Sequence, residues 1–259
     1  MTILVSIKIH DGIVMAADSA SSFASGMVYH HARKIRNIVE GVPVGVMVAG
    51  SGGIGTESID TLLKDLRVRL RGEDPEYPDW KLDIAHYTVE QVAARIQKFL
   101  HGEKVRAYAG TVRAQIRLCG YSAGASLAEA WDVFLDTAEA RPPSCAQAQN
   151  DFGPRWAGET EALDRLVLGL PGRFEELAGT AGLAPDAVRH LRACLAPGLY
   201  ELVFLEAMPL GDAAALARYL VEVTMGFVRF SIARPKTIGG PIEIAAITKH
   251  EGFHWLEHG

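Results

Sequence analysis

Three side chains near the start of the chain have the types and the spacing of a hydroxyl nucleophile and its activating groups. Thr2, Asp18 and Lys34 are equally spaced along the sequence. If Met1 is removed, which the small Thr2 side chain permits, Thr2 carries both a hydroxyl and a free α-amine. An α-amine with a pKa near ~8 takes up the hydroxyl proton at neutral pH. A lysine charge would lower the pKa of both groups, and a carboxylate would hold the lysine in place. An ordinary Met-Thr start and a solvated ion pair are the alternatives.

A glycine-rich segment, 50–55, follows a run of apolar residues and matches the G-x-G-x-x-G pattern of dinucleotide-binding turns. Such a unit needs a second buried strand that ends in an acidic residue about 20 positions later. A polar, proline-containing loop occupies that place at 72–78. We therefore interpret the segment as backbone that lets N–H groups approach a reacting carbonyl, or as a tight turn. No cofactor is expected.

Composition describes an ordinary globular protein. The chain has 259 residues, 49% hydrophobic and 22% charged, and nothing in it forces a division into two domains. A net charge of −5 without a basic stretch argues against nucleic acid as a partner. We expect a single domain over residues 1–259.

Cysteine usage and the N-terminus indicate a reduced compartment. The three cysteines, Cys119, Cys145 and Cys194, are scattered and lack metal-ligand spacing, as do the nine histidines, so no metal is expected. Charged and polar residues interrupt the first apolar run at residues 8–11, which argues against a secretory signal. No apolar segment approaches the ~20 residues of a membrane helix. We expect a cytoplasmic protein without a membrane contact.

The periodicity predicts blocks of hairpins separated by blocks of helices. Hairpins are predicted at 2–9 with 13–20, 34–39 with 43–49, 112–121 with 127–134, and 242–247 with 253–256. Helices are predicted from Thr56 to Arg71, after the capping box that begins at Thr88, as a pair within 173–196, and from Asp212 to Phe230, with Pro235 beyond its end. The segment 21–26 is predicted to be a polar loop, and 137–155 an irregular connection. This order favours an α+β fold, a four-layer α-β-β-α sandwich of two antiparallel sheets flanked by helices.

These residues together resemble the β-type subunits of proteasomes, which are N-terminal-nucleophile hydrolases. The resemblance is carried by the segments 2–8 and 11–19, by Lys34, by Ala49-Gly50, by Cys119-Gly120-Tyr121, and by Gly239-Gly240 before the final strands. Bacterial relatives are the most similar, with the β-proteobacterial proteasome homologue favoured and HslV and Anbu close.

The resemblance implies roles for residues of this chain. Thr2 would be the nucleophile, Asp18 and Lys34 would tune it, and the Gly50 N–H would form the oxyanion hole. Three further residues, Ser21, Ala32 and Val48, would line the first specificity pocket and admit small apolar side chains.

Two positions depart from the family pattern. A family serine near the third helix is replaced within Trp156-Ala157-Gly158-Glu159. The family's late aspartate and serine, which bind the terminal amine, align with Pro235 and Ile238, and Thr237 is a candidate replacement. A segment of about 170–205 exceeds the family pattern and is predicted to be a helical insertion.

The resulting hypothesis is a self-compartmentalising threonine-type peptidase that cleaves peptides or unfolded proteins. The resemblance implies a homo-oligomeric double ring, with seven subunits per ring preferred over six, and leaves an ATP-dependent unfoldase open as a partner. The alternatives are a catalytically weak or inactive ring component and an N-terminal-nucleophile amidase for small amides.

Overall fold

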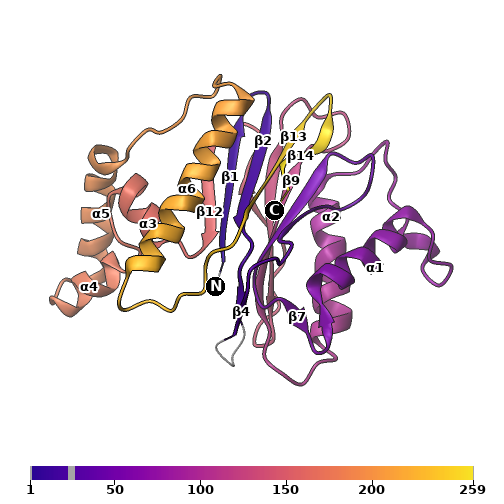
Figure 1. Cartoon of the computed structure of the whole chain (residues 1–259), viewed down its shortest axis with the longest axis horizontal. Helices are drawn as coiled ribbons and strands as arrows, with labels where there is room; N and C mark the ends of the chain where they lie inside the picture. Colours follow the sequence, from indigo (N-terminus) through magenta and orange to yellow (C-terminus); the bar gives the residue numbers. More distant parts are fainter. Residues whose placement is uncertain (1, 23–26, 259) are drawn as a thin grey trace.

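The computed structural model of the chain describes residues 2–22 and 27–258, and these residues form four layers (Figure 1). Two five-stranded antiparallel sheets pack face to face, and helices cover the outer face of each sheet. The predicted α+β sandwich of two antiparallel sheets flanked by helices is confirmed.

The first sheet contains the start and the end of the described chain. Its strand order is β12-β1-β2-β13-β14, with β1 at Ile3–Ile9, β2 at Gly12–Asp18, β12 at Gly153–Gly158, β13 at Ile242–Thr248 and β14 at Gly252–Glu257. Every residue of β1 and β2 is buried, because this sheet is covered on both faces.

The second sheet contains the central hairpin. Its order is β11-β10-β9-β6-β5, with β5 at Ile35–Asn37, β6 at Val44–Gly50, β9 at Arg113–Gly120, β10 at Glu129–Asp136 and β11 at Ser144–Gln147. Two small hairpins complete the strands: β3 at Ser21–Ser22 pairs with β4 at Val28–Tyr29, and β7 at Gly53–Ile54 pairs with β8 at Glu57–Ser58.

Two groups of helices cover the two sheets. The second sheet is covered by α1 at Ile59–Arg71 and α2 at Val89–Ile96, which continues as a π-helix, η2, at Gln97–Val105; a 3₁₀ turn, η1, lies between them at Pro78–Trp80. The first sheet is covered by α3 at Glu161–Leu163, its π-helical continuation η3 at Asp164–Leu168, and α6 at Leu210–Phe230. Helices α4 at Phe174–Thr180 and α5 at Pro185–Leu199 lie outside this group (Figure 1).

Three apolar clusters correspond to the three interfaces between the layers. One joins the second sheet to α1 and α2, another joins the first sheet to α3 and α6, and a third lies between the sheets. Full burial of one large aliphatic side chain contributes about 1.5–3 kcal/mol. The stripe Ile59, Leu62, Leu63, Leu66 and Leu70 on α1 therefore fixes this helix on its sheet. The capping box of α2, from the Thr88 side chain to Gln91 and back, is confirmed.

The connection predicted to be irregular at 137–155 is the main error in the predicted elements. It contains β11 and the beginning of β12. Both strands lie at sheet edges, and β12 includes Pro154, which lacks a backbone N–H and is tolerated only at an edge or a bulge. Pro154 therefore does not indicate an irregular chain here.

Two helix boundaries and one loop also differ from the prediction. Helix α1 begins at Ile59 because β7 and β8 intervene between Gly50 and the helix. Helix α6 begins at Leu210 rather than at the predicted Asp212, and it ends at Phe230 as predicted. Part of the predicted polar loop is the hairpin of β3 and β4, while residues 23–26 lie outside the described residues.

Candidate active site

Thr2 lies immediately before β1 at one end of the interface between the sheets. It is 6% exposed, and its neighbour Ile3 pairs with Gly158 of β12. The β1–β2 hairpin pairs Leu4 with Ala17, so the next residue, Asp18, lies beside Ile3. The backbone N–H of Ile3 donates a hydrogen bond of 3.1 Å to Oδ1 of Asp18. The hairpin thus brings Asp18 to the start of the chain, as predicted. Met1 lies outside the described residues.

Asp18 is a fully buried carboxylate with four donors. Its Oδ1 accepts from Ile3 and from Nζ of Lys34 at 2.7 Å, and its Oδ2 accepts from the backbone N–H groups of Ala20 (3.2 Å) and Gly239 (3.1 Å). Buried carboxylates need such partners, because desolvation otherwise makes the charged form costly. The four donors fix the orientation of Asp18.

Lys34 precedes β5, which belongs to the second sheet rather than to the sheet of Asp18. The ion pair between Lys34 and Asp18 therefore bridges the two sheets. Lys34 is 7% exposed, and this burial lowers the pKa of its ammonium from 10.5, while the charges of Asp18 and Glu243 act in the opposite direction. The result is a buried cation with a lowered pKa next to the start of the chain.

One small pocket gathers most of the predicted site residues. It has a volume of about 70 Å³, far below the ~300–1,000 Å³ of typical small-molecule pockets. Thr2, Lys34 and Gly50 line it together with the three predicted specificity residues, Ser21, Ala32 and Val48. Asp18 lies outside the lining, bonded to Lys34.

Gly50 takes a backbone conformation that favours glycine. Its φ is +96°, and a Cβ there would lie 2.3 Å from the carbonyl oxygen of Arg113. Any other residue would therefore separate β6 from the adjoining end of β9. The glycine allows the backbone to line the pocket closely.

The carbonyl of Thr2 is held from the side of β12. The backbone N–H of Glu159 donates to it at 2.8 Å, and Gly158, with φ of +89°, lies so close that a Cβ would be 1.9 Å from the same oxygen. The buried carboxylate of Glu159 forms an ion pair with Arg234. Sequence reasoning noted Gly158 and Glu159 only as departures from a pattern.

The residues at the other departures are apolar or bonded elsewhere. Ala157 is buried in the apolar cluster between the sheets, and Ile238 packs against the cluster under α6. The Thr237 hydroxyl donates to the carbonyl oxygen of Pro235 at 3.5 Å, within its own segment. The link from this segment to the site is instead the backbone N–H of Gly239, which binds Asp18.

Sequence reasoning missed two further groups. Glu243 of β13 accepts from the backbone N–H groups of Lys34 (2.9 Å) and Ile35 (3.2 Å). Arg36 and Asp60 form an ion pair in the lining of the pocket, in addition to the three predicted specificity residues. No local signal in the sequence marks these residues, because their partners lie on other elements.

Comparison with known proteins supports the fold. No protein-family model and no curated protein matches the chain. Among solved structures, Anbu (ancestral beta-subunit) from Yersinia bercovieri is similar, with 14% sequence identity, a TM-score of 0.61, and coverage of 99% of this chain and 87% of that chain. The fold is that of Anbu. The predicted fold, that of a proteasome β-type subunit, is thus confirmed, and Anbu is among the relatives that the resemblance named. The preference for the β-proteobacterial homologue stays a prediction.

Proposed function

We propose that the protein is a threonine-type peptidase in which Thr2, exposed as the N-terminal residue by removal of Met1, is the nucleophile. One observation carries this proposal: the carboxylate of Asp18 accepts hydrogen bonds from both the backbone amide of Ile3 and the ammonium of Lys34. This arrangement holds a buried cation at the start of the chain, where a free α-amine and a hydroxyl would share Thr2.

The reaction begins with proton transfer from the Thr2 hydroxyl to its own α-amine. The Lys34 charge lowers the pKa of both groups, so the amine is neutral and the hydroxyl is more acidic at neutral pH. The Thr2 oxygen then attacks the peptide carbonyl, and the amine returns its proton to the leaving nitrogen. Gly50 supplies a backbone N–H to the developing oxyanion. Water hydrolyses the resulting ester and regenerates Thr2.

The small pocket supports a preference for short side chains next to the cleaved bond. Its volume of about 70 Å³ leaves little room beside Val48, Ala32 and Ser21, and the Arg36–Asp60 ion pair occupies part of its lining. Substrates would be peptides or unfolded segments, since a folded chain does not present an extended backbone to a buried Thr2.

Assembly into a closed homo-oligomeric ring is part of the proposal. The structural neighbour Anbu is described as an ancestral beta-subunit, and an enclosed chamber would keep an active Thr2 away from other proteins. A double ring, with seven chains per ring preferred over six, a cytoplasmic location and an ATP-driven unfoldase that supplies substrates follow from the same resemblance. No helix within the described ranges is long and apolar enough to cross a membrane.

A peptide epoxyketone tests the proposal because it reacts with a hydroxyl and a free amine on one residue. We expect intact mass to show Met1 removed and one inhibitor added per chain, with no addition to Thr2→Ala. Sedimentation of the same sample should show a particle of many subunits. A chain that starts at Thr2 in assembled rings but stays unmodified would instead favour the inactive ring component, which the residues Ala157 and Ile238 at family polar positions also support.

A further inference from the structure

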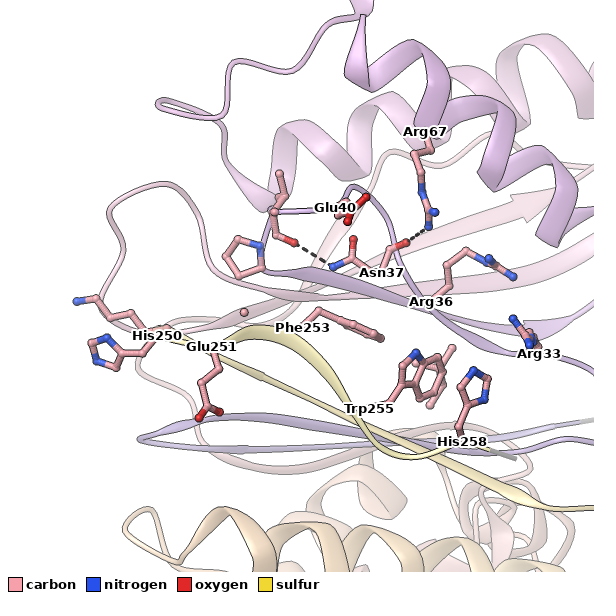
Figure 2. Close-up of a pocket in the computed structure, with 16 residues that line it drawn as sticks. Arg33, Arg36, Asn37, Glu40, Arg67, His250, Glu251, Phe253, Trp255 and His258 are labelled. Carbon is pink, nitrogen blue, oxygen red and sulfur yellow. Dashed lines mark hydrogen bonds between the residues drawn. The ribbon is translucent and has the colours of Figure 1, made fainter. Parts of the chain in front are cut away.

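A second, larger cavity lies between the edge strands of the two sheets. It has a volume of about 580 Å³ and is lined by β5, the turn that follows it, α1, and the β13–β14 hairpin. Figure 2 shows its labelled side chains, with Arg33, Arg36 and His258 toward one end and His250 and Glu251 toward the other. Arg33 and Arg36 also line the Thr2 pocket, so they form a shared wall.

One end of this cavity is crowded with arginines. Burial and then the charges of Arg67 and Arg33 lower the pKa of Arg36, while the charge of Glu243 raises it. Such crowding is unfavourable unless an anion is bound near it.

The carboxylates near this end compensate its charge only in part. Asp60 pairs with Arg36, but it also binds Nζ of Lys64 at 2.9 Å. Arg67 donates to two neutral backbone carbonyl oxygens, those of Asn37 and Ile38. Arginine forks bind carboxylates and phosphates, so an added anion of either kind would complete this cluster.

The middle of the cavity is aromatic. Phe253 and Trp255 pack edge to face with centroids 5.5 Å apart, and His258 stacks on Trp255 at 4.4 Å. Phe253 and Trp255 are half-buried in β14, and the exposed His258 follows the strand; together these rings offer a wall beside the arginines (Figure 2). A ligand with an apolar group next to its anion would cover both features.

The opposite end decides between kinds of anion. Glu251 lies at this end beside His250, and Glu40 lies nearer Asn37 in the middle (Figure 2), so two carboxylates line the cavity beyond the arginines, together with Lys249. A ligand with several phosphates along its length would be repelled by these carboxylates. A ligand with one anionic end and a neutral or cationic remainder fits the whole cavity.

We propose that this cavity binds the C-terminal end of a short peptide, with its α-carboxylate at Arg33 and Arg36 and its last side chain against Trp255. The supply of such peptides rests on the proposed peptidase activity, but binding does not. Occupancy would place a product beside the wall of the Thr2 pocket.

The test uses Thr2→Ala protein, so that nothing is hydrolysed, and calorimetric titration with the tetrapeptide Ala-Ala-Ala-Leu as free acid or as C-terminal amide. We expect the acid to bind at least tenfold more tightly than the amide. Arg33→Gln should remove most of that difference. Substitution of the exposed Arg173, which immediately precedes α4, by Gln should not change it.

Two variants assign binding to this cavity rather than to the Thr2 pocket. Trp255 and the exposed His258 line the larger cavity but not the Thr2 pocket. Trp255→Leu and His258→Ala should each weaken binding of the free-acid peptide roughly three- to tenfold. The proposal is overturned if the free acid and the amide bind with equal affinity. It is also overturned if neither Trp255→Leu nor His258→Ala changes the affinity for the free acid. Inorganic phosphate that displaces the peptide at a concentration equal to the peptide's dissociation constant would also overturn the proposal. Such displacement would indicate a general oxyanion site. Failure of any of these leaves the epoxyketone result on Thr2 unaffected.

Discussion

The carboxylate of Glu243 holds the backbone of Lys34 through a hydrogen bond of 2.9 Å from its amide. Glu243 is buried in β13, and Lys34 enters β5 of the other sheet. The two residues are therefore joined across the sandwich. The charge of the same glutamate also raises the pKa of the Lys34 ammonium, although burial lowers that pKa more and Asp18 raises it more.

The activity should fall at alkaline pH below the ordinary lysine range. Burial lowers the pKa of Lys34 from 10.5, and the proposed mechanism needs its charged form. As pH rises through that lowered pKa, the charge is lost and kcat/KM declines. Steady-state hydrolysis of a fluorogenic peptide between pH 6 and 10.5 measures this limb. Lys34→Ala should lower kcat/KM about 10²–10⁴-fold. Unchanged hydrolysis in an assembled Lys34→Ala protein would make the lysine merely structural.

Glu243→Gln should move the alkaline limb to lower pH. The amide oxygen still accepts a hydrogen bond from Lys34, but the negative charge that raises the Lys34 pKa is gone. The pH profile of kcat/KM is compared with that of Glu251→Gln, whose side chain is 69% exposed. If the alkaline limb of kcat/KM lies at the wild-type pH in both variants, Glu243 does not affect the titrating group.

Asp18→Asn should reduce both activity and stability. The asparagine cannot compensate the buried Lys34 charge, and breaking a buried ion pair typically costs about 3–5 kcal/mol. Urea unfolding gives the stability change, and peptide hydrolysis should fall by about 10²-fold or more. Asp186→Asn, at an exposed ion pair, is the matched control and should change neither by a measurable amount. Wild-type stability in Asp18→Asn would contradict the interpretation of this pair.

Gly158→Ala should abolish activity while Gly41→Ala should not. Both glycines have positive φ, +89° and +80°, so both alanines carry the backbone cost of about 1–2 kcal/mol. Only at Gly158 would the new Cβ meet the Thr2 carbonyl oxygen, whereas open space surrounds Gly41. Hydrolysis rates and thermal unfolding of the two variants separate displacement of Thr2 from general strain. Equal activities at equal stability would disprove the role of Gly158.

Lys8 should make the protein more stable as pH rises from about 8. The side chain is fully buried, and its Nζ donates to the carbonyl oxygens of Ala148 and Gln149, both at 2.6 Å. Burial lowers its pKa from 10.5 to about 8. Between these values the unfolded chain holds a proton that the folded chain has released, so unfolding becomes less favourable with pH.

The comparison of wild type with Lys8→Met isolates this effect. We expect the free energy of unfolding of wild type to gain on the order of 1 kcal/mol over the variant between pH 8 and 9.5. Urea titrations at the two pH values provide the measurement. A constant difference between wild type and Lys8→Met would show that the lysine keeps its proton.

Local pattern was sufficient for the elements that carry most of the site. Alternation around Asp11-Gly12 predicted the β1–β2 hairpin, and that hairpin alone brings Asp18 to Ile3. Helical spacing predicted α1, α2 and α6, because burial of one face leaves a periodic stripe. Edge strands β11 and β12 were not predictable in this way, since an edge strand is half exposed and admits proline.

Residue type and short-range spacing were enough to predict the nucleophile candidate, its charged companions and the layered fold, because they encode hairpins and amphipathic helices. The distant groups that complete the site become apparent only in the folded chain. Gly239 reaches Asp18, Glu243 reaches Lys34, and Glu159 reaches Thr2 across long intervals of sequence. Their backbone and carboxylate groups carry no local signature. Packing of the two sheets brings them together, and burial then makes each hydrogen bond necessary.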